Sequence, residues 1–546
     1  MPQPSSAAGR PVRALLAAAA LASIQTILYL MALHPGVGDG DAAELQWAAP
    51  LLGIAHSPGY ALQITAGKLF TLLPLGGDAA WRMNLMSAVF GVLGALALFS
   101  AVRRITGRTV PALVAQAILA FGSVYWSQSL IAEVYVFGAA FLCMAIDAGS
   151  RFIHAGRVGW LAASALLLGV AVTERPSEIL IVPAFAGLML AFRRRVPMPL
   201  ARWLLAAACL AAPFALAVAL NVTRADPDRL AARDDALRDR LIGYQEGEVT
   251  FPYLRAGDPV AALRSTVPFM LGLPWKERIA GVGDPGSPGG GGIGRTAAKY
   301  ASLLAGGGLF GDRFAPTGAT DPMLKAGISP GILGLSLALL GAILWRRETG
   351  WVVLGAGLLA GNLLFVLAYD AWDNLTFTIP GQIGLALLAG LGAAGPSDRS
   401  MRPRAARALG LVSLLIAISM APINFARVNR NTQEESGNQR LMARVAEASL
   451  PENAAILTKY WPAMTLRYIF WIRADRPDVS VIHAIRGTHL ELALHLHDQG
   501  RALFVTGDVI PKRIERELAA RTPEELRSLG LLSLGDLTDI PLPEEP

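Results

Sequence analysis

Residues 81–101 read WRMNLMSAVFGVLGALALFSA, and this stretch shows the pattern that decides the fold. After Asn84 it contains no charged residue, and its length matches the roughly 20 apolar residues that a helix needs to cross a hydrocarbon core of about 30 Å. Similar runs recur from the N-terminus to about residue 424. The sequence therefore predicts a mainly α-helical, polytopic membrane protein.

The composition supports the same class of protein. Of the 546 residues, 53% are hydrophobic and 16% are charged, whereas about 25% charged residues are usual in a soluble domain. Charged residues return at globular density only after residue 425. We therefore expect a transmembrane domain at 1–424 and a small soluble α/β domain at 425–546. Its expected strands are 454–457, 479–482 and 502–505, and its expected helices are 440–448 and 523–529.

The apolar runs predict about eleven transmembrane helices. The first run extends to about Met31 without a convincing cleavage site, so we expect it to remain as a helix rather than to be removed as a signal peptide. The expected spans are residues 13–33, 81–101, 109–124, 131–149, 158–173, 177–192, 202–221, 328–345, 351–369, 377–394 and 407–424.

The basic residues indicate orientation. The net charge is +7, but Lys and Arg form short clusters between apolar runs rather than a stripe along one face, which argues against nucleic acid binding. Cytoplasmic loops retain Lys and Arg. The clusters therefore place the N-terminus in the cytoplasm and the loop 34–80, the segment 222–326 and the tail outside. The arginine-rich and alanine-rich composition favours a bacterial inner membrane. The clusters lie at 10–13, 103–108, 151–157, 193–202, 346–347 and 399–407.

Cysteine and histidine usage predicts no structural metal or disulfide framework. Cys143 and Cys209 both fall inside apolar runs, where a cysteine usually behaves as a small buried hydrophobe. The seven histidines are scattered along the chain. The sequence therefore predicts no metal site, although a divalent cation held by Asp39 and Asp41 stays open as an alternative.

The first outer loop carries the most informative polar residues. It reads Gly38-Asp39-Gly40-Asp41-Ala42-Ala43-Glu44, and three carboxylates next to a membrane boundary are costly enough to need a reason. One explanation is a capping box, in which Asp41 accepts from backbone N–H groups at a helix start and Glu44 reaches back. The other is that Asp41 and Glu44 include a general base that takes a proton from an acceptor hydroxyl.

Cationic or hydrogen-bonding side chains follow in the same loop. His56, Lys68 and Arg82 are suited to stabilise a phosphate leaving group, because charge that develops in a water-poor interface is strongly felt by fixed donors. The alternatives are a loop hydrogen bond for His56 and an interfacial anchor for Arg82.

At these residues the chain resembles a known family. Residues 34–90 look like the start of the protein O-mannosyltransferase-like membrane family, which belongs to the GT-C glycosyltransferase superfamily. The family pattern Asp-x-Gly-Glu is met by Asp41-Ala-Ala-Glu44, and the pattern Gly-x-x-His-Pro-Pro-Gly-Tyr by Gly53-Ile-Ala-His-Ser-Pro-Gly-Tyr60. The pattern Arg-x-Asn-x-x-Ser-Ala is met by residues 82–88. Ala43 replaces the usual Gly and Ser57 the first Pro, and neither change removes a titratable group.

Two later stretches extend the resemblance. Glu133-Val-Tyr135 is like the family's Glu-Val-Tyr, and residues 373–380 are like its Asp-x-x-x-Phe-x-x-Pro stretch. Glu133 starts a span on the outer side, where an ionisable group marks a candidate site, although an interhelical hydrogen bond is the alternative. Glu174, Arg175 and Glu178 lie at another outward turn, and we expect them to pair with one another.

The resemblance implies an inverting GT-C enzyme that takes a sugar from a polyprenyl phosphate at the outer face and passes it to a hydroxyl of a protein or glycan. No cofactor is required for such a donor, and a divalent cation remains compatible with it. The expected catalytic residues are Asp41 and Glu44. The expected donor or substrate-binding residues are Asp39, His56, Tyr60, Arg82, Asn84, Glu133, Tyr135, Asp370 and Asp373.

Two other functions stay open at this point. A transporter or flippase for a lipid-linked or small polar substrate would usually show an internal repeat with paired Gly or Pro breaks near mid-membrane, and the sequence has none that we can identify. A noncatalytic assembly or sensor subunit would tolerate replacement of the outer carboxylates.

Overall fold

The computed structural model describes residues 9–224, 259–272, 331–369, 376–398, 400–431, 450–458, 460–474, 476, 478–483, 502–505 and 532–533. Contacts divide the chain into two units. The helical unit comprises Met1–His34, Asn84–Leu216 and Trp275–Thr432, and the loop unit comprises Pro35–Met83, Ala217–Pro274 and Gln433–Pro546. The domain boundary expected at residue 424 stays a prediction.

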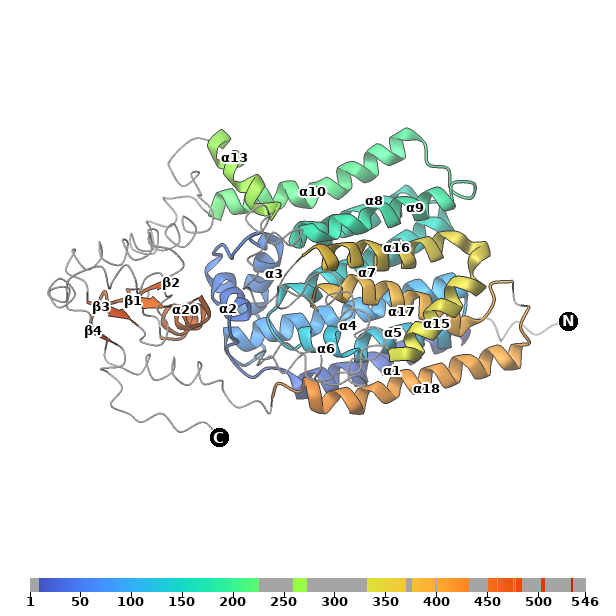
Figure 1. The fold of residues 1–546 in the computed structure, drawn as a ribbon, viewed down its shortest axis with the longest axis horizontal. Coiled ribbons are helices and arrows are strands. Elements are labelled where there is room, and N and C mark those ends of the chain that lie inside the picture. The colour runs from blue at the N-terminus through green and yellow to red at the C-terminus, as the bar shows by residue number, and fades with distance from the viewer. Residues whose placement is uncertain are drawn as a thin grey trace. The chain divides into compact units, whose positions relative to one another are not determined.

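Long apolar helices build the helical unit, and Figure 1 shows α4, α5, α7, α16 and α17 running alongside one another. Its helices are α1 (Gly9–Ala32), α4 (Ala79–Thr106), α5 (Thr109–Phe121), α6 (Ser123–Gln128), α7 (Val134–Ala155), α8 (Val158–Glu174), α9 (Val182–Ala191), α10 (Leu200–Arg224), α15 (Gly331–Leu344), α16 (Thr349–Ala368), α17 (Ile379–Ala394) and α18 (Pro403–Val428). Short 3-10 turns are η1 (Pro176–Ile181), η7 (Arg346–Glu348) and η8 (Thr376–Thr378). The unit boundary falls within α4 and α10, so the ends of these two helices count with the loop unit.

Helix α17 forms the centre of this unit. All of its residues are buried, and α5, α15 and α16 pack against it. Gly341 of α15 and Gly392 of α17 allow the closest approach, because a Cβ at either position would overlap the backbone of the other helix. Small residues at such crossings are typical of membrane helix packing, where van der Waals contact drives association.

Seven described helices are long and apolar enough to cross a membrane, judged by length and composition: Val12–Ala32, Ala79–Thr106, Val134–Ala155, Leu200–Arg224, Thr349–Ala368, Thr376–Ala394 and Pro403–Val428. Four shorter apolar helices, Thr109–Phe121, Val158–Glu174, Pro176–Ala191 and Gly334–Leu344, fall in the remaining expected ranges. The prediction of a mainly helical, polytopic membrane protein is confirmed. The total of eleven spans stays a prediction, because the four shorter helices fall below the usual spanning length.

The loop unit combines helices from the loop 34–80, the segment 222–326 and the tail with a small sheet from the tail. Its helices are α2 (Asp41–Leu51), α3 (Ala61–Leu72), α13 (Pro259–Met270) and α20 (Tyr460–Tyr468), and a π-helical turn η9 (Ile469–Arg473) follows α20. The strands are β1 (Ala455–Thr458), β2 (Ser480–His483), β3 (Leu503–Val505) and β4 (Leu532–Ser533). They form a sheet in the order β2-β1-β3-β4.

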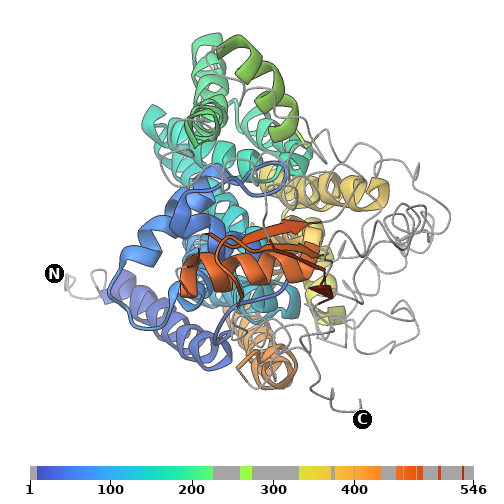
Figure 2. The same cartoon turned by 90° about the vertical axis from the view of Figure 1, so that its left-hand side faces the viewer.

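The described strand pairs of this sheet are parallel. The apolar runs expected as strands form β1, β2 and β3, and α20 lies beside the sheet in Figure 2. Parallel neighbours need crossover connections, usually helical, and α20 leads from β1 toward β2 in this way. The helices expected at 440–448 and 523–529 lie outside the described residues.

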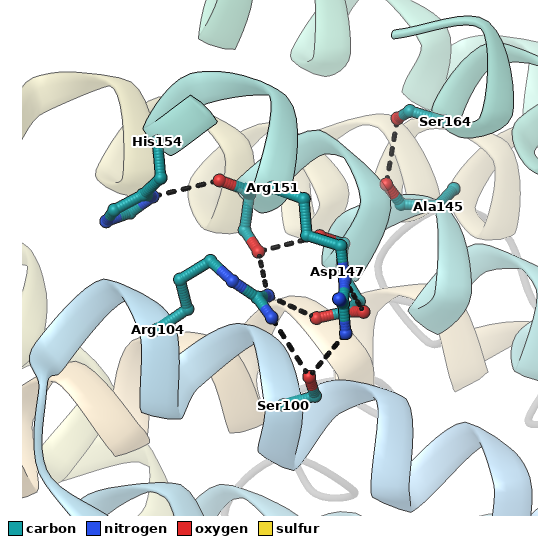
Figure 3. Close-up of polar contacts among 8 residues, drawn as sticks. Ser100, Arg104, Ala145, Asp147, Arg151, His154 and Ser164 are labelled. Atoms are coloured by element: carbon teal, nitrogen blue, oxygen red, sulfur yellow. Dashed lines mark hydrogen bonds and ion pairs between the residues drawn. The ribbon is translucent and has the colours of Figure 1, made fainter. Parts of the chain in front are cut away.

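A polar cluster joins α4 and α7 at one end of the helical unit (Figure 3). The Asp147 carboxylate accepts from Arg104 Nη1 at 2.6 Å and from Arg151 Nε at 2.8 Å. Arg104 also donates to Ser150 Oγ at 2.8 Å, and Arg151 Nη2 donates to Ser100 Oγ at 3.3 Å. None of the side-chain nitrogens or oxygens of Arg104, Asp147 or Arg151 is left buried without a hydrogen-bond partner. These arginines therefore have a structural role, and the orientation expected from the basic clusters stays a prediction.

Candidate active site

Helix α2 brings Asp41 and Glu44 into its first turn, but not as the capping box considered from the sequence. The helix begins at Asp41 itself, so the N-cap is Gly40, which has no side chain to cap with. The Glu44 carboxylate contacts His56 instead of reaching back to the helix start. The capping explanation is wrong because a partner twelve residues away competes successfully for the same carboxylate.

Glu44 is fully buried, and both of its oxygens face His56. Glu44 Oε1 accepts from the backbone N–H of His56 at 3.0 Å, and Oε2 contacts His56 Nδ1. A carboxylate beside one ring nitrogen fixes the tautomer and the orientation of an imidazole. We infer that Nδ1 carries a proton toward Glu44, so that Nε2 is the nitrogen presented to the site.

His56 Nε2 lies between two oxygen atoms. It is 3.8 Å from Asp41 Oδ2 and 3.3 Å from the hydroxyl of Tyr60. The rings of His56 and Tyr60 meet edge to face with centroids 5.1 Å apart. Asp41, His56 and Tyr60 thus form one polar surface, and Glu44 lies behind it.

Exposure separates the two expected catalytic carboxylates. The Asp41 side chain is 40% exposed and that of His56 is 12% exposed, whereas that of Glu44 is 0% exposed. A general base must come within hydrogen-bond distance of the proton that it removes. The exposed Asp41 carboxylate can be approached by a substrate from the solvent side. Glu44 is buried behind His56, where it is placed to orient the imidazole.

The backbone at Tyr60 is held in an uncommon conformation. Its φ of 42° lies in the left-handed region, which costs a bulky residue about 1–3 kcal/mol and persists only where neighbours impose it. Ser57 Oγ donates to the Phe269 carbonyl at 2.5 Å. Gly59 has a φ of +89°, and a Cβ there would lie 2.9 Å from atoms of both Asn221 and Phe269. Helices α10 and α13 therefore fix the loop that presents His56 and Tyr60.

Asp41, Glu44 and His56 also have the composition of a metal site. One ligand atom from each residue lies within 4.8 Å of the others, and carboxylate oxygen with imidazole nitrogen is a donor set used by divalent transition metals. The sequence pointed to Asp39 and Asp41 for this purpose and missed His56, because the contact between residues 44 and 56 depends on the fold of the loop.

The two basic side chains expected to bind phosphate are engaged with backbone carbonyls. Arg82 donates through Nη1, Nε and Nη2 to the carbonyls of Thr71, Gly76 and Gly77 at 2.6, 3.0 and 3.3 Å. Lys68 Nζ donates to the Pro50 carbonyl at 2.6 Å. In this arrangement both residues stabilise their own loops, and their role toward phosphate stays a prediction.

The remaining expected residues lie in several places. Asp39 is partly exposed directly before α2. Asn84 is fully buried in the helical unit and donates to the His34 carbonyl at 3.0 Å. Asp370 and Asp373 lie outside the described residues.

Glu133 and Tyr135 mark a second polar region, within the helical unit. Glu133 is the N-cap of α7 and makes no side-chain capping bond. The Arg175 guanidinium lies 4.8 Å from the ring centroid of Tyr135 and 5.0 Å from that of Phe377. Arg175 Nη1 is 3.3 Å from Glu178 Oε1, so the Arg175–Glu178 part of the expected pairing is present.

Sequence reasoning missed the residues that support the loop from a distance. Asn221 and Phe269 contact Gly59, and Arg467 and Trp471 of the tail contact Trp47 of α2. These partners are separated from the loop by more than a hundred residues of chain. No local pattern signals such pairings.

Comparison with known proteins places the resemblance on one part of the chain. Residues 41–197 match the family model described as the protein O-mannosyl-transferase TMEM260 N-terminal domain. The mouse protein O-mannosyl-transferase TMEM260 is 33% identical over 138 residues, which are 25% of this chain and 19% of the relative. The Dictyostelium discoideum protein is 26% identical over 178 residues, which are 30% of this chain and 22% of the relative. The matched region thus covers about a fifth of each relative, and both organisms are eukaryotes.

Solved structures show a more distant likeness. The Archaeoglobus fulgidus oligosaccharyltransferase in complex with Zn and sulfate is 13% identical with a TM-score of 0.44, covering 85% of this chain and 62% of that chain. ArnT from Cupriavidus metallidurans bound to undecaprenyl phosphate is 12% identical with a TM-score of 0.44, covering 91% and 90%. The sequence match begins at Asp41 and includes His56, Tyr60 and Arg82. The resemblance to the protein O-mannosyltransferase-like family, predicted from three motifs, is confirmed for residues 41–197.

Proposed function

We propose that this protein is a membrane glycosyltransferase of the GT-C type. It transfers a sugar, such as mannose, from a polyprenyl phosphate to a hydroxyl group of an extracytoplasmic protein or glycan. The match of residues 41–197 to a domain named for protein O-mannosyl transfer supports this activity. The apolar helices support a lipid-linked donor that reaches the enzyme from the membrane.

One observation carries the assignment of the chemistry. Asp41 presents a solvent-accessible carboxylate beside a histidine that a fully buried glutamate holds in place. The acceptor hydroxyl oxygen attacks the anomeric carbon, and the bond from that carbon to the phosphate oxygen breaks. The hydroxyl proton passes to Asp41, and the polyprenyl phosphate leaves with the bonding electron pair. Attack opposite the leaving group inverts the anomeric configuration.

The surrounding residues have distinct roles in this proposal. Glu44 is a positioning residue that orients His56. His56 in its protonated form donates from Nε2 toward the leaving phosphate, where a fixed donor stabilises the charge that develops. Tyr60 lies within reach of the same nitrogen.

A divalent cation is not required by this mechanism. Asp41, Glu44 and His56 have the donor atoms to hold one, and a bound cation would supply positive charge next to the phosphate. Chelation with EDTA, followed by addition of Mg²⁺ or Mn²⁺, tests this point. Transfer is expected to persist after chelation, and a loss that Mn²⁺ restores would show that the cation is obligatory.

The orientation follows the distribution of basic residues. The proposal places the N-terminus in the cytoplasm and the loop unit outside, at the bacterial inner membrane or an equivalent membrane. The bacterial assignment follows from the arginine-rich and alanine-rich composition.

The test is reconstitution of the purified full chain in liposomes with polyprenyl phosphate mannose or polyprenyl phosphate glucose and a serine- and threonine-containing acceptor peptide. The expected result is peptide-linked sugar whose anomeric configuration, read by NMR, is opposite to that of the donor. Retained configuration would contradict the direct displacement. Movement of the intact lipid donor between leaflets without sugar transfer would favour a flippase.

A further inference from the structure

An arginine of the tail packs against two tryptophans that also contact each other, one of them in α2. Arg467 of α20 is 1% exposed. Its guanidinium carbon is 5.5 Å from the ring centroid of Trp47 in α2 and 5.4 Å from that of Trp471 in η9. The two indoles meet edge to face at 5.3 Å. Cation–π contacts are strongest when they are removed from water, so this stack is a firm connection between the tail and α2.

The same arginine is anchored to the sheet. Its Nε and Nη2 atoms donate to the carbonyl of Val481 in β2 at 3.3 and 3.1 Å. The Trp471 indole donates to the Val479 carbonyl at 3.0 Å. Arg467 and Trp471 thus join Trp47 to the backbone of β2 and of the residue directly before it.

The tail also contacts residues before α2 and at the start of α4. The hydroxyl of Tyr468 accepts from the backbone N–H of Ala80 at 2.9 Å, at the start of α4. Thr465 Oγ1 donates to the Gly38 carbonyl at 3.5 Å, just before α2. Burial raises the pKa of the Tyr468 hydroxyl well above its ordinary value, and the neighbouring Asp78 carboxylate adds to this effect. Tyr468 therefore stays protonated throughout the physiological range.

A π-helical turn marks the place where Trp471 sits. Residues Ile469–Arg473 form this turn, and the N–H of Ala474 donates to the carbonyl of Ile469 at 2.8 Å. Single π turns inside helices occur often at functional sites. The wider turn still leaves both Arg467 and Trp471 in contact with Trp47.

The geometry on α2 connects this stack to Glu44. Trp47 follows Glu44 by three residues, so the two side chains are neighbours on one helix surface. Both are buried. A shift of Trp47 therefore shifts the carboxylate that holds His56.

We propose that Arg467 and Trp471 are positioning residues through which the C-terminal domain holds α2, and with it Glu44 and His56, in the arrangement that transfers sugar. This inference rests on the proposed function for its catalytic consequence. The structural consequence is independent of it: without the stack, the first turns of α2 lose their fixed position.

The experiment compares two arginines of the same domain in the purified full chain. Arg467→Gln removes the stacked cation while leaving an amide that can still donate to Val481. Arg476→Gln is the matched control, because Arg476 pairs with Asp478 at 2.8 Å and is partly exposed. Three quantities are measured for each protein: the rate of transfer from pre-bound polyprenyl phosphate mannose, the Kd of that lipid, and amide hydrogen exchange at residues 42–48.

For Arg467→Gln we expect transfer to slow at least about tenfold, with the lipid Kd within about twofold of wild type and faster exchange at residues 42–48. For Arg476→Gln all three quantities should match wild type. Trp471→Phe keeps an aromatic ring but loses the indole donor. Its transfer rate and amide exchange should lie between those of the two arginine variants.

Two results would overturn the proposal. One is Arg467→Gln transferring at the wild-type rate with unchanged exchange in α2. The other is an equal loss of transfer and equal exchange in both arginine variants, which would indicate general destabilisation of the domain. If the wild-type protein itself transfers no sugar, the proposed function fails, and the exchange measurement still decides whether the tail holds α2.

Discussion

Two clusters of charged side chains use the same residue types in different ways. Between α4 and α7, Asp147 is shared by Arg104 and Arg151, and Ser150 and Ser100 accept further hydrogen bonds from the two guanidinium groups. In the loop 34–80, Glu44 is fully buried against His56, while the Asp41 side chain remains 40% exposed. In the first arrangement the charged groups are bound to one another and to neighbouring serines. The second holds one ring rigidly and leaves a carboxylate within reach of a substrate.

In the proposed mechanism, this difference in exposure and pairing separates a structural carboxylate from a reactive one. Ionisable groups near the membrane are costly in either place. The cluster between α4 and α7 offsets that cost by mutual hydrogen bonds. The outer cluster uses a buried carboxylate to orient a histidine, as catalytic and metal sites do. The following substitutions test this distinction.

The largest effect is expected for Asp41→Asn. Asn cannot take the acceptor proton, and a positioned general base typically contributes 10²- to 10⁴-fold. Transfer should therefore fall at least about 100-fold. Asp41 is the first residue of α2, so the loss of its charge should lower stability by about 0.3–1 kcal/mol through the helix dipole. Radiolabelled sugar transfer at matched amounts of folded protein measures the effect. Transfer near the wild-type rate would show that Asp41 has a structural role, as Asp147 does.

Glu44→Gln should affect both rate and stability. The amide oxygen can accept one of the two hydrogen bonds from His56, but the amide N–H₂ group then faces a ring nitrogen that itself donates. We expect transfer to fall about 10- to 100-fold, as a misplacement of about 1 Å can cause. Loss of a hydrogen bond to a charged group should lower stability by about 1.5–3 kcal/mol. Steady-state transfer and thermal unfolding measure the two effects. If Glu44→Gln transfers sugar at the wild-type rate but is less stable, Glu44 does not position His56 for catalysis.

Asp147→Asn is the counterpart in the cluster between α4 and α7. It leaves two arginines sharing a neutral amide, and we expect a loss of about 1.5–3 kcal/mol in stability. The transfer rate per folded molecule should stay within about twofold of wild type, because the cluster has no reacting partner in the proposed mechanism. Thermal unfolding in detergent and transfer in liposomes give the two values. A rate loss as large as that of Asp41→Asn would abolish the distinction between the clusters.

The smallest effect concerns a surface pair in the tail. Its hydrogen bond from Arg476 lowers the pKa of the Asp478 carboxyl to about 2. A folded-state pKa below the ordinary value of 3.8 means that the stabilisation is present above that value and is lost as the pH falls toward 2. Asp478→Asn should cost at most about 1 kcal/mol at neutral pH, because the pair is partly exposed. Unfolding measured between pH 7 and pH 3 should show the difference from wild type shrinking at the acid end. A difference that grows as the pH falls would contradict this assignment.

The fold could be predicted wherever its signal is local. The apolar runs gave the helix positions because a spanning helix needs a minimum apolar length whatever its neighbours are. Three short apolar runs in the tail gave β1, β2 and β3. The domain grouping could not be predicted, since the contacts of α2 with α20 join residues more than 400 positions apart.

The residues of the candidate site could be predicted from the sequence, but their hydrogen-bond partners could not. The motifs identified Asp41, Glu44, His56 and Tyr60. Local pattern left a capping box open as one role for Glu44, whereas in the folded loop its carboxylate contacts His56. Arg82 looked like a phosphate ligand, yet in the structure its guanidinium binds three carbonyls of its own loop. Such choices depend on which partners the backbone brings within hydrogen-bond distance.

The central claim is that Asp41 acts on the acceptor proton rather than on donor binding. A single-turnover experiment tests it most directly, starting from purified protein with polyprenyl phosphate mannose already bound and adding the acceptor peptide. For Asp41→Asn the account predicts a donor Kd within about twofold of wild type and a transfer rate at least about 100-fold lower. A variant that transfers normally once the donor is bound, or one whose defect lies in donor affinity, would contradict the account.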